Sequence, residues 1–374
     1  LTQTLLALQL RRASDVSYGK FHAKNLKFVP TPSPKPIPED ISGLAIGSIE
    51  TDHMLQIDYT NGEWQAPVIR PVEPLTIHPL AKVLHYCPTI FEGLKAFRGV
   101  DNKIRMFRPE MNMARLRRSA RRAALPDFCP LQLEQMIKDL VRIEQAWVPK
   151  GEGNSLYIRP NLFGTDASLG VARPLEAKLV VTCSPFGPIY GSGWNPIKLF
   201  ANPKHIRAAP GGVGSFKMGC NYAPTVAITD KAAAYTAQCL WLSGEQQWIT
   251  EAGAFNLFLY WKNTKGELEL ITPPTTDGLI LPGITRDSIL TLVKEWGEFK
   301  ITERYPTMKE VKEAVAEGRV IEFFGVGTAV VVVPVSQIVY QEKAGESSVV
   351  IDFPEPTDTM PLSKRVHETI TGIQ

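Results

Sequence analysis

Twelve residues near the middle of the chain, Pro185 to Pro196, contain three prolines and three glycines. Such a run interrupts regular structure, because proline lacks a backbone N–H donor and glycine has no side chain to pack. The chain has 374 residues, about two and a half times a typical domain of roughly 150 residues. We therefore predict two domains, over residues 41–186 and 197–374, joined by a linker at residues 187–196.

Residues 1–40 are predicted to form an N-terminal arm. Prolines alternate with other residues between Pro30 and Pro38, which is typical of an extended, polyproline-like segment. Residues 1–14 contain Arg11, Arg12 and no acid, which resembles the end of a mitochondrial transit peptide and is equally typical of a frayed basic tail. No apolar run approaches the roughly 18 residues that a membrane-spanning helix needs, so we expect no such helix.

The apolar patterning predicts helices that alternate with mostly antiparallel hairpins, which is an α+β class with two domains. Asn61-Gly62 and Asp101-Asn102 are typical of hairpin turns. A capping box at Thr307 and Glu310 indicates that a helix begins at Met308. Other helices are expected over residues 109–124, 131–146 and 286–296 and after Pro224, and a tight turn is expected over Gly325–Ala329.

Composition argues against several classes of function. Basic residues exceed acidic ones by only 3, which is too small an excess for a protein that wraps nucleic acid. The five cysteines show no Cys-x-x-Cys spacing and the histidines no His-Glu-x-x-His pattern, so we expect no metal site and a reducing compartment.

A glycine-rich segment, Gly211–Lys217, ends in a lysine between Phe216 and Met218. It is not a phosphate loop, which has glycine before the lysine and Ser or Thr after it. Apolar neighbours can desolvate a lysine, which lowers its pKa and raises the fraction of neutral amine that attacks an aldehyde. Lys217 is therefore a candidate Schiff-base residue, and an ordinary surface turn is the alternative.

Arginines cluster in the first predicted domain between Arg105 and Arg122. Their spacing places Arg115, Arg118 and Arg122 on one face of the predicted helix, and Arg117 and Arg121 on another. One buried arginine can clamp a phosphate with two hydrogen bonds. We expect the other four to form a solvated face. Nucleic-acid binding is an alternative, weakened by the absence of interleaved aromatic residues that would stack on bases.

Two glycine turns offer backbone N–H groups to an anion. Leu281–Arg286 leads directly into a predicted helix, whose first amides form a ready phosphate site. A simple N-cap role for Thr285 is the alternative there. The second candidate is the Gly325–Ala329 turn, where successive N–H groups can form an anion nest, and an ordinary hairpin turn is the alternative.

Glu251 stands at the end of an apolar strand, where a carboxylate is costly unless it meets a cation. A pyridinium nitrogen would serve, since an acid at that nitrogen keeps the ring of pyridoxal phosphate protonated. A lysine for the aldehyde, an acid for the ring nitrogen and anion sites for the phosphate together favour a pyridoxal phosphate enzyme.

The ordered motifs of the chain resemble a known family, the fold type IV pyridoxal phosphate aminotransferases, and within it the eukaryotic branched-chain-amino-acid aminotransferases. The resemblance runs from about Phe21 to the C-terminus. Its motifs are Thr51–Met54, Leu84–Tyr86, Phe91–Phe97, Asn112–Arg115, Leu156–Pro160 and Gly219–Tyr222, together with those around Lys217, Glu251, Pro282 and Gly327.

The resemblance implies a two-domain fold with a small N-terminal α/β domain and a larger pyridoxal phosphate-binding pseudo-barrel. It implies transamination of leucine, isoleucine or valine with 2-oxoglutarate by a ping-pong route, with Lys217 as the catalytic Schiff-base residue. The implied cofactor contacts are Arg115, Tyr222, Glu251, Ile284, Thr285 and Thr328. The implied substrate contacts are Tyr86, Phe91, Tyr157, Arg159, Leu169, Val171 and Ala329, with Leu169 and Val171 supplied by a partner subunit and Arg159 facing the distal carboxylate of glutamate.

The resemblance further implies a homodimer with its site near the subunit interface, no nucleic-acid or membrane partner, and the mitochondrial matrix as compartment, with the cytoplasm as the alternative. Another enzyme of the same fold, a D-amino-acid aminotransferase or an aminodeoxychorismate-lyase-like enzyme, is the alternative function. Glu50, Ile189, Ala254 and Cys220 depart from the family pattern near the implied pocket.

Overall fold

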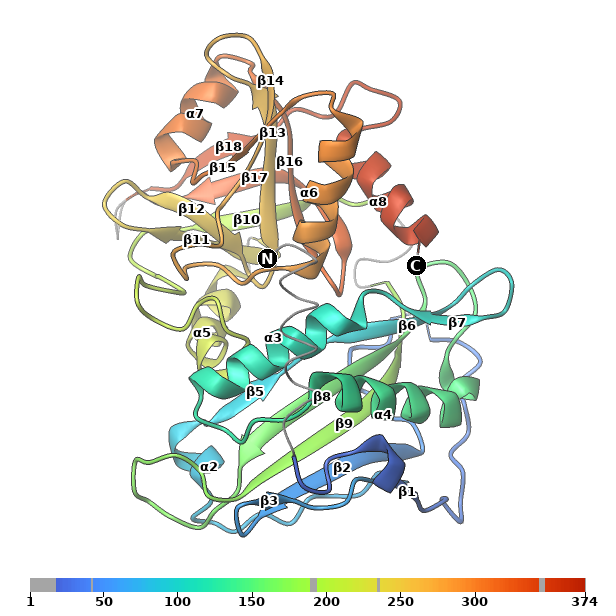
Figure 1. Ribbon diagram of the computed structural model, residues 1–374. Coiled ribbons are helices and arrows are strands. Elements are labelled where there is room, and N and C mark those ends of the chain that lie inside the picture. Colours follow the sequence, from blue (N-terminus) through green and yellow to red (C-terminus); the bar gives the residue numbers. More distant parts are fainter. Residues whose placement is uncertain (1–17, 42, 189–193, 234–235, 343–346, 374) are drawn as a thin grey trace. The chain divides into compact units, whose positions relative to one another are not determined.

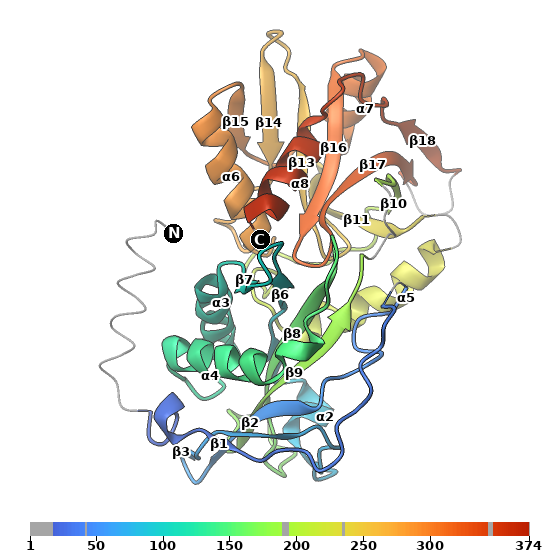
Figure 2. The same cartoon turned by 90° about the vertical axis from the view of Figure 1, so that its right-hand side faces the viewer.

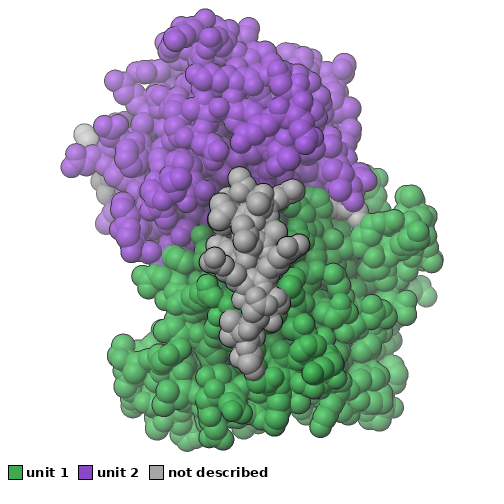
Figure 3. All heavy atoms as spheres, in the orientation of Figure 1, with its two compact units in different colours: residues 1–191, 216–220, 374 green, residues 192–215, 221–373 purple. Residues whose placement is uncertain are grey.

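The computed structural model describes residues 18–41, 43–188, 194–233, 236–342 and 347–373. It divides into two compact units, one built from residues 1–191 and 216–220 and the other from residues 192–215 and 221–373 (Figure 3). Residues 1–14, which resemble a transit peptide, and residues 189–193 of the predicted linker lie outside the described residues.

The first unit is built around a nine-stranded sheet with the strand order β1-β4-β2-β9-β8-β6-β7, in which β3 also pairs with β2 and β5 with β8. Its pairs are antiparallel except β1 with β4. The strands are β1 (Lys27–Phe28), β2 (His53–Thr60), β3 (Glu63–Trp64), β4 (Val68–Pro71), β5 (Thr89–Phe91), β6 (Leu94–Arg98), β7 (Ile104–Met106), β8 (Ser155–Gly164) and β9 (Ala177–Phe186).

Two fourteen-residue helices, α3 (Pro109–Arg122) and α4 (Pro130–Ile143), cover one face of this sheet (Figures 1 and 2). Each begins with proline, whose missing N–H is not needed in the first turn. Their apolar stripes are buried, with Met113 and Leu116 on α3 and Leu133 on α4 fully covered. A shorter helix, α2 (Lys82–Tyr86), precedes β5. The helices thereby fix the backbone on which the candidate site residues of this unit lie.

The second unit is built around another nine-stranded sheet, ordered β12-β11-β10-β17-β16-β13-β14-β15, with β18 paired to β17. Parallel pairs, such as β10 with β11 and with β17, occur beside antiparallel hairpins. The strands are β10 (Ile197–Ala201), β11 (Gln238–Ser243), β12 (Trp248–Ala252), β13 (Asn256–Lys262), β14 (Leu268–Thr272), β15 (Lys300–Glu303), β16 (Val320–Gly327), β17 (Val331–Tyr340) and β18 (Val349–Asp352).

Four helices pack on the strands of the second unit: α5 on β11, α6 on β16, α7 on β16 and β18, and α8 on β16 and β17. Their bounds are α5 (Ala223–Ala232), α6 (Ile284–Trp296), α7 (Met308–Ala316) and α8 (Leu362–Ile373). Helices and largely antiparallel sheets in two units confirm the predicted α+β class. Among the described residues, no helix has the length and apolar character needed to cross a membrane.

Most locally signalled elements are confirmed. The turn at Asn61-Gly62 joins β2 to β3, and both residues have the positive φ that such a turn requires. Helix α7 begins at Met308, and Thr307 and Glu310 form the predicted capping box.

The prediction of a tight turn over Gly325–Ala329 is wrong at its start. Strand β16 continues to Gly327, which pairs with Val331, so the turn occupies residues 328–330. Gly325 instead admits close packing: a Cβ there would lie 3.4 Å from Cβ of Phe255. Glycine within a strand marks such a close approach as readily as it marks a turn.

Candidate active site

The backbone of Lys217 is fixed from two sides within the first unit. Its N–H donates to Oγ of Ser119 on α3 at 3.0 Å, and its carbonyl accepts from the N–H of Phe91 on β5 at 3.1 Å. The next residue, Met218, forms an antiparallel bridge with Ile90. Ser119 is fully buried, so this anchor is shielded from water. A short segment distant in sequence thus becomes an added edge of β5.

Phe91, Tyr157 and Arg159 lie together near the lysine side chain. The Lys217 ammonium is 4.9 Å from the ring centre of Phe91. The Arg159 guanidinium is 4.9 Å from that same ring and 5.2 Å from the ring of Tyr157, and it donates to the Tyr157 hydroxyl at 3.1 Å. The structure therefore brings together three of the predicted substrate residues and the predicted Schiff-base lysine.

Arg159 has an unusual polar environment. Its Nε is buried without a hydrogen-bond partner, and no carboxylate in the described part of the chain lies within 4.0 Å of its guanidinium. A desolvated donor of this kind is costly unless an anion completes it. Gly93 makes room for Tyr157 beside it, since a Cβ on Gly93 would lie 1.9 Å from the tyrosine hydroxyl. The pair is thus suited to receive a carboxylate.

Arg115, the predicted phosphate ligand, forms a buried bidentate ion pair with Glu92. Its Nε and Nη2 lie 2.7 and 2.8 Å from the two carboxylate oxygens, and Asn112 donates to Glu92 as well, at 2.8 Å. This network ties α3 to the residue that follows β5. The phosphate role of Arg115 stays a prediction.

The two predicted arginine faces of α3 are confirmed, but the expected solvated face is wrong for two of its members. Arg118 and Arg122 lie over the ring of Phe216, at 5.0 and 5.9 Å, and Arg117 pairs with Asp127 at 2.7 Å. Only Arg121 and Arg122 are exposed. A nearby ring and a nearby carboxylate give Arg118 and Arg117 partners that spacing along the helix could not indicate.

Tyr86, Leu169 and Val171 form a second, exposed group in the first unit. The Tyr86 hydroxyl donates to the carbonyl of Leu169 at 2.5 Å, and the three residues are 44%, 53% and 85% exposed. Leu80, Leu84 and Leu175 nearby are exposed as well. We call these six residues the apolar patch. Tyr86 thus lies with Leu169, and not with the ring of Tyr157 as its predicted role in one pocket implied.

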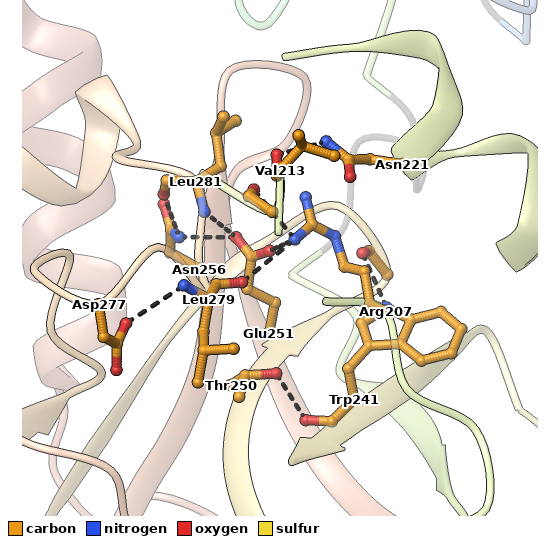
Figure 4. Close-up of polar contacts among 12 residues, drawn as sticks. Arg207, Val213, Asn221, Trp241, Thr250, Glu251, Asn256, Asp277, Leu279 and Leu281 are labelled. Carbon is orange, nitrogen blue, oxygen red and sulfur yellow. Dashed lines mark hydrogen bonds and ion pairs between the residues drawn. The ribbon is translucent and has the colours of Figure 1, made fainter. Parts of the chain in front are cut away.

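In the second unit, Glu251 is buried at the end of β12 and held by three groups (Figure 4). One oxygen accepts from Asn256 Nδ2 at 3.0 Å and from the N–H of Leu281 at 3.2 Å. The other lies 2.7 Å from Nη1 of Arg207, which is equally buried. A buried carboxylate needs such a partner to stay ionised, so the arrangement keeps an acceptor with negative charge inside the protein.

The N-terminus of α6 lies in the same unit. Gly283 is its N-cap, and no side chain caps the helix, which leaves the first backbone N–H groups without an intrahelical acceptor. The alternative that Thr285 is the N-cap is wrong, because Thr285 is the second helical residue. A Cβ on Gly283 would lie 1.9 Å from Oδ1 of Asn256, which excludes other residues and makes glycine the cap.

The remaining predicted residues of this unit also lie at element ends. Tyr222 is the N-cap residue of α5, where its carbonyl accepts from Thr225. Thr328 and Ala329 are half-buried in the turn between β16 and β17. Among the described residues, no group of three or more His, Cys, Asp or Glu is placed to hold a metal ion.

Sequence reasoning missed Ser119, Arg207 and Asn256. Arg207 also donates to the carbonyl of Gly214 at 3.3 Å, and so links the glycine-rich loop to Glu251. The demand of Glu251 for a cation was the only signal for such a residue, and it did not say which arginine answers. Asn256 and Ser119 act by tertiary contacts that no spacing indicates.

Comparisons with known proteins agree on one family. The model of the family described as "Amino-transferase class IV" matches residues 89–338. Over 339 residues, the chain is 49% identical to the cytosolic branched-chain-amino-acid aminotransferase of Caenorhabditis elegans, covering 90% of this chain and 82% of that protein. It is 46% identical over 328 residues to the mitochondrial branched-chain-amino-acid aminotransferase of Rattus norvegicus, covering 87% and 83%.

A solved structure is similar as well. A bacterial-type branched-chain amino acid aminotransferase, from the source abbreviated T.th. and complexed with N-(5′-phosphopyridoxyl)-L-glutamate, matches with a TM-score of 0.62 and 25% identity, over 85% of this chain and 95% of that one.

Proposed function

The chain belongs to the class IV aminotransferases, and within them to the branched-chain-amino-acid aminotransferases, and on this premise we propose that it uses pyridoxal 5′-phosphate to transfer the amino group of leucine, isoleucine or valine to 2-oxoglutarate. The products are the branched-chain 2-oxo acid and glutamate, and the reverse transfer uses the same groups.

The donor set fits this cofactor. When bound, pyridoxal phosphate supplies an aldehyde that condenses with amines and a ring that accepts electrons. Lys217 is the amine for that aldehyde. Glu251, kept ionised by Arg207, suits a protonated ring nitrogen, and Tyr222 is assigned to the ring hydroxyl. The uncapped amides of Ile284 and Thr285 suit the phosphate, together with Arg115 and Thr328.

Lys217 has the second role of moving the proton at the substrate Cα. The bonds of its backbone to Ser119 and Phe91 hold the start of the side chain while the amine moves. A fixed base gains from its position, because a correctly oriented group needs no search for the reacting atom. The Phe91 ring beside its amine covers one side of the amine and keeps water from that side.

The observation that carries the substrate assignment is Arg159. Its guanidinium, framed by Phe91 and Tyr157 with a buried Nε that lacks a partner, suits the distal carboxylate of glutamate or 2-oxoglutarate. The two rings suit the aliphatic side chain of leucine at the same place. The glutamyl group of the ligand in the similar solved structure supports this choice, and the Ala329 amide is assigned to the substrate's α-carboxylate.

A homodimer completes the proposal. The apolar patch is larger than single exposed apolar residues scattered over a surface, and such patches mark interaction sites. A second copy of the chain covers it, and Tyr86, Leu169 and Val171 then act together on the side-chain pocket of the partner subunit.

The compartment is proposed to be the mitochondrial matrix, on the basis of the acid-free basic stretch at residues 1–14. The similar proteins include both a cytosolic and a mitochondrial one. Import of the chain into isolated mitochondria, compared with a chain in which Arg11 and Arg12 are alanine, tests this assignment.

The test of the proposed function is the absorbance spectrum of the purified protein. We expect a visible band that leucine bleaches and 2-oxoglutarate restores, and that is lost in Lys217→Ala. Lys231→Ala, a lysine in the last turn of α5, should keep the band. A colourless wild type that cannot be reconstituted with the cofactor contradicts the proposal. Bleaching by D-alanine but not by leucine would favour a D-amino-acid aminotransferase instead.

A further inference from the structure

Two exposed cysteines of the first unit, Cys87 and Cys220, stand beyond the same end of one backbone pairing. Ile90 and Met218 are antiparallel partners, so the chain runs from Ile90 back to Cys87 in the same direction as it runs from Met218 on to Cys220. Directly opposite residues of an antiparallel pair have Cα atoms about 4.5–5.5 Å apart. Residues 133 positions apart in sequence are thus brought to one place.

The pairing continues one residue beyond the bridge. A Cβ on Gly219 would lie 2.7 Å from Cγ2 of Thr89, so these two residues are in close approach. Cys220 follows directly. On the other segment the chain turns tightly at Cys87, which has a left-handed backbone with φ 52° and ψ 40°, and its carbonyl accepts from the N–H of Thr89 at 2.7 Å. The turn keeps Cys87 beside the pairing instead of extending away from it.

Electrostatic coupling agrees with this placement. Burial raises the pKa of the Cys220 thiol, a thiolate at Cys87 raises it further, and Arg122 lowers it. Charges influence each other in this way only over short distances in salt solution.

We propose that Cys87 and Cys220 form a thiol pair that a hydroperoxide closes to an intrachain disulfide, which restrains the segment carrying Lys217 and lowers the transaminase activity. The effect on activity rests on the proposed function, whereas the disulfide itself does not.

The chemistry balances with hydrogen peroxide as the two-electron oxidant. The Cys87 thiolate attacks one peroxide oxygen, the O–O bond breaks, and after proton transfer water leaves and a sulfenic acid remains. The Cys220 sulfur then attacks the Cys87 sulfur, and the S–O bond breaks as a second water leaves. Two thiols and one peroxide thus give one disulfide and two waters. Cys220 takes the second step because its raised pKa leaves it less thiolate at neutral pH.

The bond has a structural cost that explains the loss of activity. A disulfide holds its two Cα atoms within about 7 Å and fixes its dihedral angles. Cys220 is three residues after Lys217, whose carbonyl and N–H are already bonded to Phe91 and Ser119. Tightening the segment at Cys220 shifts the lysine, and a shift of about 1 Å costs a catalyst up to roughly 100-fold in rate.

The experiment treats the cofactor-loaded enzyme with hydrogen peroxide and follows both mass and activity. We expect the intact chain to lose about 2 Da and a non-reducing digest to contain a peptide pair joined through Cys87 and Cys220. Activity should fall roughly 10- to 100-fold and return with dithiothreitol. Cys87→Ser and Cys220→Ser should keep their activity in peroxide, whereas Cys183→Ala should behave as wild type, since Cys183 is buried and burial raises the pKa of its thiol.

Three results would overturn the proposal: oxidation of Cys87 and Cys220 only to separate acids, a disulfide between two copies of the chain, or a joined peptide pair with unchanged activity. Failure of the proposed function is distinguishable, because the joined peptide pair is detected by mass whether or not the protein transaminates leucine.

Discussion

Arg159 lies between two rings with no carboxylate within 4.0 Å in the described part of the chain. Arg159→Ala should therefore raise KM for 2-oxoglutarate and glutamate, while the half-reaction with leucine is little changed. A hydrogen bond to a charged group contributes about 1.5–3 kcal/mol, which corresponds to an increase of roughly 10- to 150-fold. The two half-reactions, followed by absorbance, measure this separation.

Arg142→Ala is the control for this substitution, since the Arg142 side chain on α4 is 69% exposed and should leave both half-reactions unchanged. An equal loss with leucine and with glutamate would show that Arg159 positions the pocket as a whole and does not select the distal carboxylate.

Lys95 gives the stability a predictable pH dependence. It is buried on β6 beside the Phe186 ring, and burial lowers its pKa to about 8. Between about pH 8 and 10.5 the unfolded chain holds this proton and the folded chain does not, so the free energy of unfolding rises with pH. At about 1.4 kcal/mol per pKa unit, the rise amounts to roughly 3 kcal/mol.

Lys95→Met removes this rise, which urea denaturation at pH 7.5, 9 and 10.5 measures. Lys103→Met is the matched control on the same hairpin, because the Lys103 side chain is 76% exposed, and it should keep the wild-type dependence. Parallel curves for wild type and Lys95→Met would show that the lysine is solvated.

At the N-terminus of α6, the helix depends on a glycine that no other residue can replace. In Gly283→Ala the new Cβ displaces Asn256, which bonds both Glu251 and the carbonyl of Leu281. We expect the free energy of unfolding to fall by about 1–3 kcal/mol, because the structure must move to remove the overlap. Urea denaturation measures this change, and dialysis of the coloured protein measures how fast cofactor is lost.

Gly372→Ala is the helical counterpart, since a Cβ at that position of α8 meets nothing within 4 Å. It should leave the cofactor in place and stabilise the protein by up to about 1 kcal/mol. Equal effects of the two alanines would mean that the contact with Asn256 is relieved without cost.

Elements with local signals could be predicted from the sequence, and contacts between distant residues could not. Prolines at the start of α3 and the capping box of α7 act within one turn, so the residues themselves reveal the helix. The turn after β16 was misplaced because a glycine in a strand and a glycine in a turn look alike until Phe255 is seen beside it. The pairing of Arg207 with Glu251 and of Met218 with Ile90 depends on the folded chain alone.

For the molecule as a whole, the apolar patch predicts self-association. Val171→Asp together with Leu84→Asp places two charges among residues that a second copy would bury, and burying unpaired charges is costly. We expect the dimer to dissociate and the activity to fall with it, as measured by sedimentation velocity and by the leucine assay at matched concentrations.

Val100→Asp provides the comparison, because Val100 is fully exposed on the hairpin between β6 and β7 and lies outside the patch. It should sediment as the wild type does. A double variant that remains dimeric and active would place the subunit contact elsewhere.

The division of the chain also matters for how a nascent chain folds. Residues 216–220 complete the first unit but are synthesised about 30 residues after the rest of it has ended at residue 191. At 5–20 residues per second, a ribosome takes about 1.5–6 s to supply them. During that interval β5 lacks its partner at Ile90, so the first unit leaves the ribosome with an open strand edge that only later synthesis closes.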